Sequence, residues 1–210
     1  KIFKLSIGSY PICTKKDFES FSKKEKLTYA LSRHPISIVF GYIYIFMYGM
    51  CLQPLLASFN KHWDSFLALI VHFVIIIISF FYLERNTAFF LCVFPHYIAG
   101  GLGALLFYVQ HNFPGVYLAE QPDWSYEVAS LRSSSYFKMG RLMNWFTANI
   151  GYHHIHHLNA RIPFYKLPEV MNRFPELNNS TVIRIKDITK CFKLKVWDRE
   201  IKEMVPFNIE

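Results

Sequence analysis

The sequence predicts an all-α, multi-pass membrane helical protein with a cytoplasmic helical cap that carries a histidine-rich metal site. Three observations support this fold class. The 210 residues are 52% hydrophobic and 18% aromatic, with long apolar runs in the first half. Four of the nine histidines fall within five consecutive residues of the second half. The net charge of +8 fits a cytoplasmic membrane face, and the apolar content favours lipid over nucleic acid as the partner.

Residues 1–35 are polar and basic, and they predict a cytoplasmic amphipathic segment. Their cations interleave with aromatic residues such as Phe18 and Tyr29, which fits either a solvated helix or a helix lying on anionic headgroups. The chain starts at Lys1 without a signal-peptide pattern. We therefore expect residues 1–210 to be a single domain that is incomplete at its N-terminus.

Residues 36–109 contain three apolar segments that predict membrane helices. The first, residues 36–56, is interrupted by two glycines and Pro54, so we expect it to enter the membrane without crossing it. Residues 66–83 and 87–109 are each close to the roughly 20 residues that a crossing requires. The short connection between them predicts an antiparallel hairpin.

The charge distribution predicts how these helices are oriented. Lys and Arg are dense before residue 35 and again after Arg132, so the positive-inside rule assigns both polar regions to the cytoplasm. Gly100, Gly101 and Gly103 predict close helix packing. The intramembrane histidines, His72 and His96, are functional candidates by position, although a structural role is the simpler interpretation.

Residues 110–180 form the predicted metal-binding cap, and residues 181–210 form a C-terminal tail with a short strand or a surface helix. Within the cap, His153, His156 and His157 share one helical face, because each residue advances about 100°, and His154 points elsewhere. Neutral imidazoles bind iron, zinc, copper or nickel. Clustered cations would repel one another, so a metal explains this group better than a surface histidine patch.

A fourth candidate ligand, His111, ends the last apolar segment on the same side as the histidine cluster. Its neighbours Gln110 and Asn112 are candidates to orient a ligand or a bound water. The sequence contains no HExxH, Walker A, GxGxxG or GxSxG motif and no ExxH pair, which argues against zincins, nucleotide enzymes and soluble carboxylate-bridged di-iron bundles. The cysteines form no CxxC pair, so free thiols are expected.

The stretch from Trp145 to Pro168 resembles the third histidine box of membrane fatty acid desaturases, and most of all the acyl-lipid Δ12 (ω-6) group. The likeness covers about residues 8–180. It extends to four further segments: Ser32-Arg33-His34-Pro35, Gln110-His111, Ser134-Ser135-Tyr136 and Phe174-Pro175-Glu176-Leu177. It implies that the chain is the C-terminal portion of an oxidoreductase that uses O₂ to introduce a cis double bond into a fatty acyl chain.

The resemblance also implies the cofactors and the residues that bind them. Two iron ions would be held by histidines, here His111, His153, His156 and His157. Further candidates lie beside the ligands or the substrate: Asn112, Asn149, His154, Trp124 and Trp145. The first two histidine boxes of the family are missing from residues 1–33, so we expect these 210 residues alone to be inactive.

The partners that the resemblance implies are a membrane lipid or fatty acyl substrate and an external electron donor, either ferredoxin or cytochrome b5. The expected location is a bacterial inner membrane, or the endoplasmic reticulum or a plastid membrane, with the metal on the cytoplasmic side. Lys138, Arg141, Arg161 and Lys166 either dock an acidic carrier or lipid headgroups, or are ordinary cytoplasmic-face charges. Trp124, Tyr126, Trp145 and Phe146 either shape an acyl tunnel or pack at the membrane interface.

Two alternatives stay open, one within enzymes and one in a different class. A related histidine-box membrane hydroxylase of carotenoids, alkanes or sterols would share the HxxHH pattern. A non-enzymatic protein would be a zinc-stabilised receptor-like bundle or an inactive desaturase remnant. The residues that flank the histidine cluster favour the desaturase.

Overall fold

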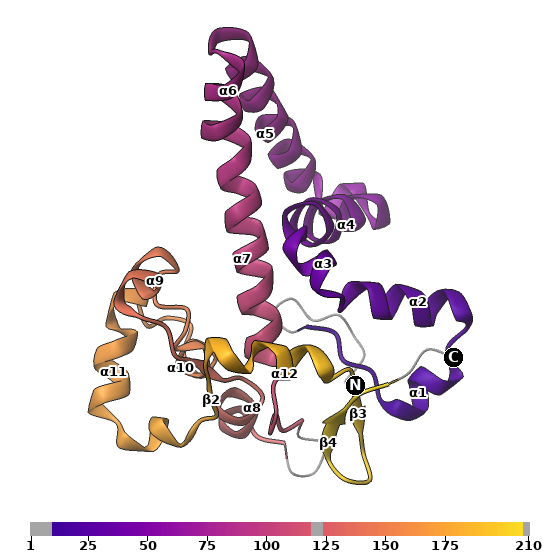
Figure 1. Cartoon of the computed structure of the whole chain (residues 1–210), viewed down its shortest axis with the longest axis vertical. Helices are drawn as coiled ribbons and strands as arrows, with labels where there is room; N and C mark the ends of the chain where they lie inside the picture. The colour runs from indigo at the N-terminus through magenta and orange to yellow at the C-terminus, as the bar shows by residue number, and fades with distance from the viewer. Residues whose placement is uncertain (1–9, 119–123, 208–210) are drawn as a thin grey trace. The chain divides into compact units, whose positions relative to one another are not determined.

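The computed structural model describes residues 10–118 and 124–207. The chain divides into two compact units, one of residues 31–105 and one of residues 1–30 together with 106–210. Most of the described residues are helical, as predicted (Figure 1). The all-α prediction omits four short strands, which form two two-stranded sheets.

The unit of residues 31–105 is entirely helical. Its elements are α3 (Pro35–Val39), the π-helix η1 (Tyr42–Leu52), α4 (Gln53–Ala57), η2 (Phe59–Lys61), α5 (Trp63–Tyr82), α6 (Arg85–Ala88), η3 (Phe89–Val93) and most of α7 (Phe94–His111). Helix α5 runs antiparallel to the continuous α6–η3–α7 rod, as the short connection predicted (Figure 1). Glu84 begins the return helix, because its carboxylate accepts a hydrogen bond from the Thr87 backbone N–H at 3.1 Å.

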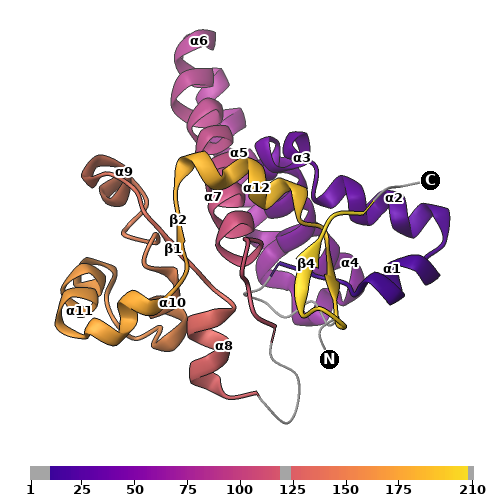
Figure 2. The same ribbon diagram turned by 60° about the horizontal axis from the view of Figure 1, so that its bottom comes forward.

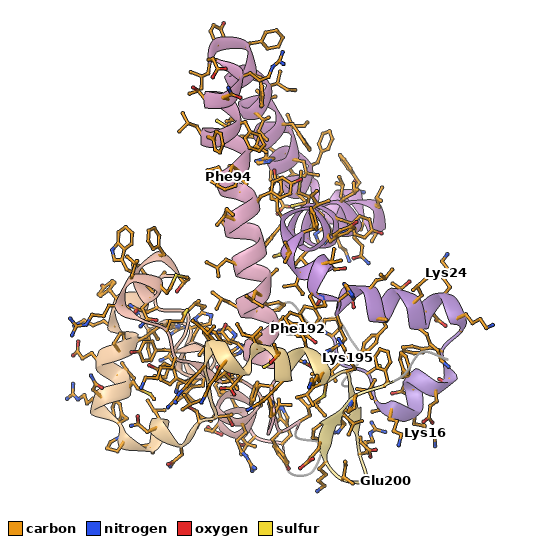
Figure 3. The ribbon with its side chains drawn as sticks, viewed as in Figure 1. Lys16, Lys24, Phe94, Phe192, Lys195 and Glu200 are labelled. Atoms are coloured by element: carbon orange, nitrogen blue, oxygen red, sulfur yellow. The ribbon has the colours of Figure 1, made fainter. Side chains whose placement is uncertain are left out.

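Two helices of the described chain, Trp63–Tyr82 and Arg85–His111, are long and apolar enough to cross a membrane. No residue of α5 is fully buried. Leu69, His72 and Ile76 lie on one half-buried stripe, and most of the other Val, Ile and Phe side chains are exposed. Phe94 of α7 likewise extends outward (Figure 3). The exposed apolar surface of α5 needs an apolar environment, and the described residues that pack on α5 do not cover it. Lipid is the environment that these side chains indicate.

The first apolar segment is shorter than a membrane span, as its glycines and proline predicted. Its apolar helix covers only Tyr42–Ala57. The predicted close packing is present, since a Cβ atom at Gly100 would lie 2.7 Å from the Tyr42 Cα and one at Gly101 would lie 2.8 Å from the Val39 carbonyl oxygen. Only glycine lets α7 approach the first segment this closely.

The second unit combines helices with both small sheets. Its elements are α1 (Lys15–Ser20), α2 (Lys23–Ser32), the end of α7, α8 (Tyr126–Arg132), β1 (Tyr136–Phe137), α9 (Arg141–Phe146), α10 (His153–Leu158), η4 (Phe164–Lys166), α11 (Leu167–Arg173), η5 (Pro175–Asn179), β2 (Val182–Ile183), η6 (Ile185–Asp187), α12 (Ile188–Lys193), β3 (Val196–Asp198) and β4 (Glu203–Val205).

The basic N-terminal segment forms two helices rather than one continuous amphipathic helix. The Thr14 hydroxyl caps α1 by accepting from the Asp17 N–H, and α1 ends before Phe21. Phe18 is buried and stacks on Phe207 at a centroid distance of 4.0 Å. The Tyr29 hydroxyl donates to the Lys195 carbonyl at 2.6 Å. Phe18 and Tyr29 therefore pack against the C-terminal residues of their own unit, whereas Leu27 and Leu31 are exposed.

The described residues of the C-terminal segment pair with residues of the same unit. Strand β2 pairs in parallel with β1, with Tyr136 opposite Val182 and Phe137 opposite Ile183 (Figure 2). Strands β3 and β4 form an antiparallel hairpin. For this C-terminal segment a short strand or a surface helix was predicted, and both occur, as β2 and α12.

Candidate metal centre

The candidate metal centre joins the end of α7 to the short helix α10. The Nε2 atoms of His111 and His153 are 2.9 Å apart, those of His153 and His157 are 3.0 Å apart, and those of His111 and His157 are 3.3 Å apart. His153 and His157 lie on one face because they are four residues apart in a helix. Among residues 10–118 and 124–207, this is the one group of three side chains whose donor atoms converge in this way.

Three converging imidazole nitrogens cannot satisfy one another by hydrogen bonding. Each Nε2 of a neutral imidazole either carries a proton or presents a lone pair. Among three such atoms at least two must have the same role, so at least one of the three contacts is repulsive. A cation removes this conflict, because all three lone pairs can point toward it.

The spacing also fits a metal ion. Two imidazole nitrogens bound to one ion at about 2.0–2.1 Å, as on zinc, lie about 2.9–3.4 Å apart for bond angles of about 90–110°. The three observed separations, from 2.9 to 3.3 Å, fall in this range. An all-imidazole donor set suits zinc, copper, iron or nickel and does not by itself select one of them.

Burial keeps the site in its metal-binding protonation state. His153 is only 6% exposed, and burial, reinforced by the neighbouring His111 and His157, lowers the pKa of His153 far below its usual value. Burial also lowers the pKa of His157, with a smaller effect from His156. Both rings are therefore neutral at physiological pH, as a metal ligand must be.

A backbone carbonyl favours one tautomer of His111. Its Nδ1 lies 3.4 Å from the carbonyl oxygen of Ser133, the residue that follows α8. A carbonyl can only accept, so this contact assigns the proton to Nδ1 and leaves the Nε2 lone pair toward His153 and His157. Metal-ligating histidines commonly donate their second N–H in this way.

The other two histidines of α10 have different surroundings. The His156 ring lies next to the cluster, with its centroid 5.9 Å from that of His153 and 6.0 Å from that of His157, and its nitrogens do not join the converging group. His154 is fully buried, beside Ile155 of the core. Burial lowers the pKa of His154 to about 4, against a smaller opposing effect of the Leu177 and Ser135 backbone.

Three side chains hold α10 and the turn before it in place, and Ser130 is the one among them that the sequence did not single out. The Tyr126 hydroxyl donates to the His157 carbonyl at 2.7 Å, and the Ser130 hydroxyl contacts the same oxygen at 3.2 Å. The Gln110 amide, beside His111, donates to the Ile150 carbonyl at 2.7 Å. Tyr126 was expected either to shape an acyl tunnel or to pack at the membrane interface, and no local pattern identifies either α8 hydroxyl as a partner of the histidine helix.

Of the remaining predicted site residues, Asn112 and Asn149 bond to backbone carbonyls, and the two tryptophans are exposed. Asn112 is buried and directs its amide to the carbonyls of Cys191 at 2.6 Å and Leu194 at 2.9 Å. Asn149 donates to the Phe164 carbonyl at 3.1 Å. Trp124 is 50% exposed and Trp145 is 75% exposed.

Comparison with known proteins identifies the family. The family model described as Fatty acid desaturase matches residues 10–184. A "Fatty acid desaturase" of Bacillus subtilis (strain 168) is 31% identical over 207 residues, which is 98% of this chain and 58% of that protein. The chain thus spans less than two thirds of this relative. With the family model matching most of its length, the chain belongs to the fatty acid desaturase family.

Proposed function

We propose that this chain is part of an integral, multi-pass membrane enzyme that introduces a cis double bond into a fatty acyl chain. The observation that carries the proposal is the convergence of His111, His153 and His157 in a member of the fatty acid desaturase family. The two long apolar helices support a membrane location. Basic residues before residue 35 and after Arg132 support a metal site on the cytoplasmic side.

The proposed metal is iron, in a di-iron centre that consumes O₂. His111, His153 and His157 would hold iron, and the adjacent His156 is the fourth proposed ligand. Bound iron would supply, with O₂ and electrons, the oxidising power that removes hydrogen from unactivated methylene groups. Four imidazoles leave two iron ions short of ligands, so we expect these 210 residues alone to form no double bond.

The protein's own groups have positioning roles in this proposal. The Ser133 carbonyl holds the proton of His111 on Nδ1, and Tyr126 and Ser130 anchor the end of α10 through the His157 carbonyl. Burial keeps the imidazoles neutral and limits water at the site. Electrons would come from an external donor, for which ferredoxin or cytochrome b5 is the family expectation.

The test is expression of the complete gene that contains these residues in a host without the activity. Mass spectrometry of the cellular fatty acids should reveal a new cis double bond. His153→Ala and His157→Ala should each abolish it, whereas His62→Ala, outside the cluster, should not. A hydroxylated product would identify a histidine-box hydroxylase instead. Unchanged lipids, together with zinc in the purified protein, would contradict the proposal.

A further inference from the structure

Helix α9 presents an unusually exposed apolar face for its size. Leu142 is 69% exposed, Trp145 is 75% exposed and Phe146 is 66% exposed. The three side chains lie three and four residues apart and therefore share one side of the helix. Clustered exposed apolar side chains of this kind mark an interaction surface.

The surroundings of this face in the sequence are strongly basic. From Val128 to Pro168 the sequence contains no Asp or Glu, and it contains five cationic residues: Arg132, Lys138, Arg141, Arg161 and Lys166. Lys166 pairs with Glu169 at 2.7 Å. Lys138, Arg141 and Arg161 are exposed and form no ion pair with another described residue. This stretch is therefore suited to an anionic partner.

Local hydrogen bonds hold the apolar face outward. The Asn149 N–H donates to the Asn144 carbonyl at 2.7 Å, which closes the turn after α9. The Asn149 side chain reaches the Phe164 carbonyl, next to two further exposed aromatic residues, Phe164 at 54% and Tyr165 at 62%. The exposed aromatics of α9 and η4 therefore belong to one braced part of the chain, and their exposure is not the fraying of a loose end.

We propose that α9 inserts Leu142, Trp145 and Phe146 into the interface of an anionic lipid bilayer, while Lys138 and Arg141 bind lipid phosphates. The amphipathic indole ring suits the headgroup level of a membrane, and basic side chains beside it add attraction to anionic lipid. Side chains that are two thirds exposed do not wall an enclosed acyl tunnel. An anionic bilayer matches both the exposed apolar face of α9 and the basic stretch without Asp or Glu around it.

The indole of Trp145 allows a direct test in the full chain. The wild-type protein and Trp145→Phe are reconstituted in vesicles of equal parts phosphatidylcholine and phosphatidylglycerol, with or without bromine on the acyl chains. The difference between their emission spectra isolates Trp145. Bromine quenches only indoles that reach the lipid, so we expect brominated lipid to remove about half or more of this signal and aqueous iodide to remove little.

A charge reversal tests the basic residues. Lys138→Glu combined with Arg141→Glu should reduce the bromine quenching of Trp145 and increase its quenching by iodide. Lys186→Glu combined with Lys193→Glu makes the same change of charge on exposed residues elsewhere and should alter neither. Emission that iodide quenches and brominated lipid does not would overturn the proposal. Emission that neither quencher reaches would also overturn it, in favour of a protein-covered face.

Discussion

The Nε2 atoms of His111 and His153 lie 2.9 Å apart, although 42 residues separate the two histidines in the chain. The first is the last residue of the apolar helix α7, and the second is the first residue of α10. The chain between them includes α8, and residues of this region contact both histidine segments. The Tyr126 hydroxyl donates to the His157 carbonyl, and the Ser133 carbonyl contacts His111. The structure thus brings together two histidines that the sequence presents in separate segments.

This convergence predicts that loss of one imidazole weakens metal binding to the purified chain. His157→Ala should lower the affinity by about tenfold or more, because it removes one of three converging donors. Removal of bound metal with a chelator should lower the thermal midpoint of the wild type, since a ligand that binds only the folded state stabilises it. Metal analysis and thermal unfolding in detergent measure both effects, with His62→Ala as the control. Equal metal content in both variants would contradict the assignment.

A second prediction concerns Asn112, whose amide bonds to the Cys191 and Leu194 carbonyls. Asn112→Ala removes one donor from each carbonyl and leaves, among the described residues, only the Leu194 N–H at 3.2 Å on Cys191 and the Tyr108 hydroxyl at 3.4 Å on Leu194, which should cost about 1–3 kcal/mol of local stability. Hydrogen–deuterium exchange should then become faster across residues 188–197. Asn178→Ala removes an exposed amide bond to the Pro175 carbonyl and is the matched control. Unchanged exchange in the Asn112 variant would show that this bond does not hold the C-terminal segment.

Those parts of the structure that depend on local pattern could be predicted. The two long apolar helices follow from composition, and the shared face of His153 and His157 follows from helical spacing. The pattern Ser22-x-x-Glu25 already marks the start of α2, since the Ser22 N–H donates to the Glu25 carboxylate at 2.9 Å and the Glu25 N–H donates to the Ser22 hydroxyl at 3.3 Å. The prediction of a single helix for this segment did not take this capping pattern into account.

The parts that depend on distant residues could not be predicted. The pairing of Tyr136 with Val182 involves strands of two residues each, too short to leave an alternating pattern. The choice of Asn112 for the C-terminal carbonyls, and of Tyr126 for the His157 carbonyl, is set by which backbone groups the fold brings near them. The sequence does not indicate which group an amide or a phenol side chain will bond to. The role expected for Asn112 therefore rested on its neighbour in the chain, His111.

The third prediction uses two glycines of α7 that differ in their surroundings. A Cβ at Gly100 would lie 2.6 Å from the Tyr42 Cβ, whereas one at Gly103 would meet nothing closer than the Phe46 ring at 3.5 Å. Gly100→Ala should therefore lower the thermal midpoint in detergent by forcing η1 and α7 apart. Gly103→Ala should be neutral or raise it, because Ala favours a helix by about 1 kcal/mol over Gly. A similar loss in both variants would argue against tight packing at Gly100.

The fourth prediction concerns the pH dependence that Cys191 contributes. Burial, with a smaller effect of Asp187, raises the pKa of this fully buried thiol to about 12. The thiol of the unfolded chain ionises near pH 8.5, so the folded state loses relative stability as the pH rises above that value, by about 2 kcal/mol at pH 10. The thermal midpoint of the wild type should fall more between pH 7.5 and 10 than that of Cys191→Ala. Parallel curves would show that the thiol does not remain protonated on folding.

The last prediction concerns the turn that leads from α9 to the histidine helix. Ala148 and Asn149 adopt φ values of 50° and 55°, in the left-handed region. Asn tolerates this conformation, but a Cβ at Ala148 costs about 1–2 kcal/mol. Glycine has no such cost in the left-handed region, but it raises the conformational entropy of the unfolded chain, which offsets part of the stabilisation. Ala148→Gly should therefore stabilise the protein by about 0.5–1 kcal/mol.

The matched control for Ala148→Gly is the same replacement in α8. Ala129 is helical, so Ala129→Gly should destabilise the protein by about 1 kcal/mol. Thermal unfolding in detergent should therefore move in opposite directions for one chemical change at two backbone conformations. Destabilisation by both replacements would mean that Ala148 does not hold the left-handed conformation in solution, and the turn that delivers His153 to His111 would need a different description.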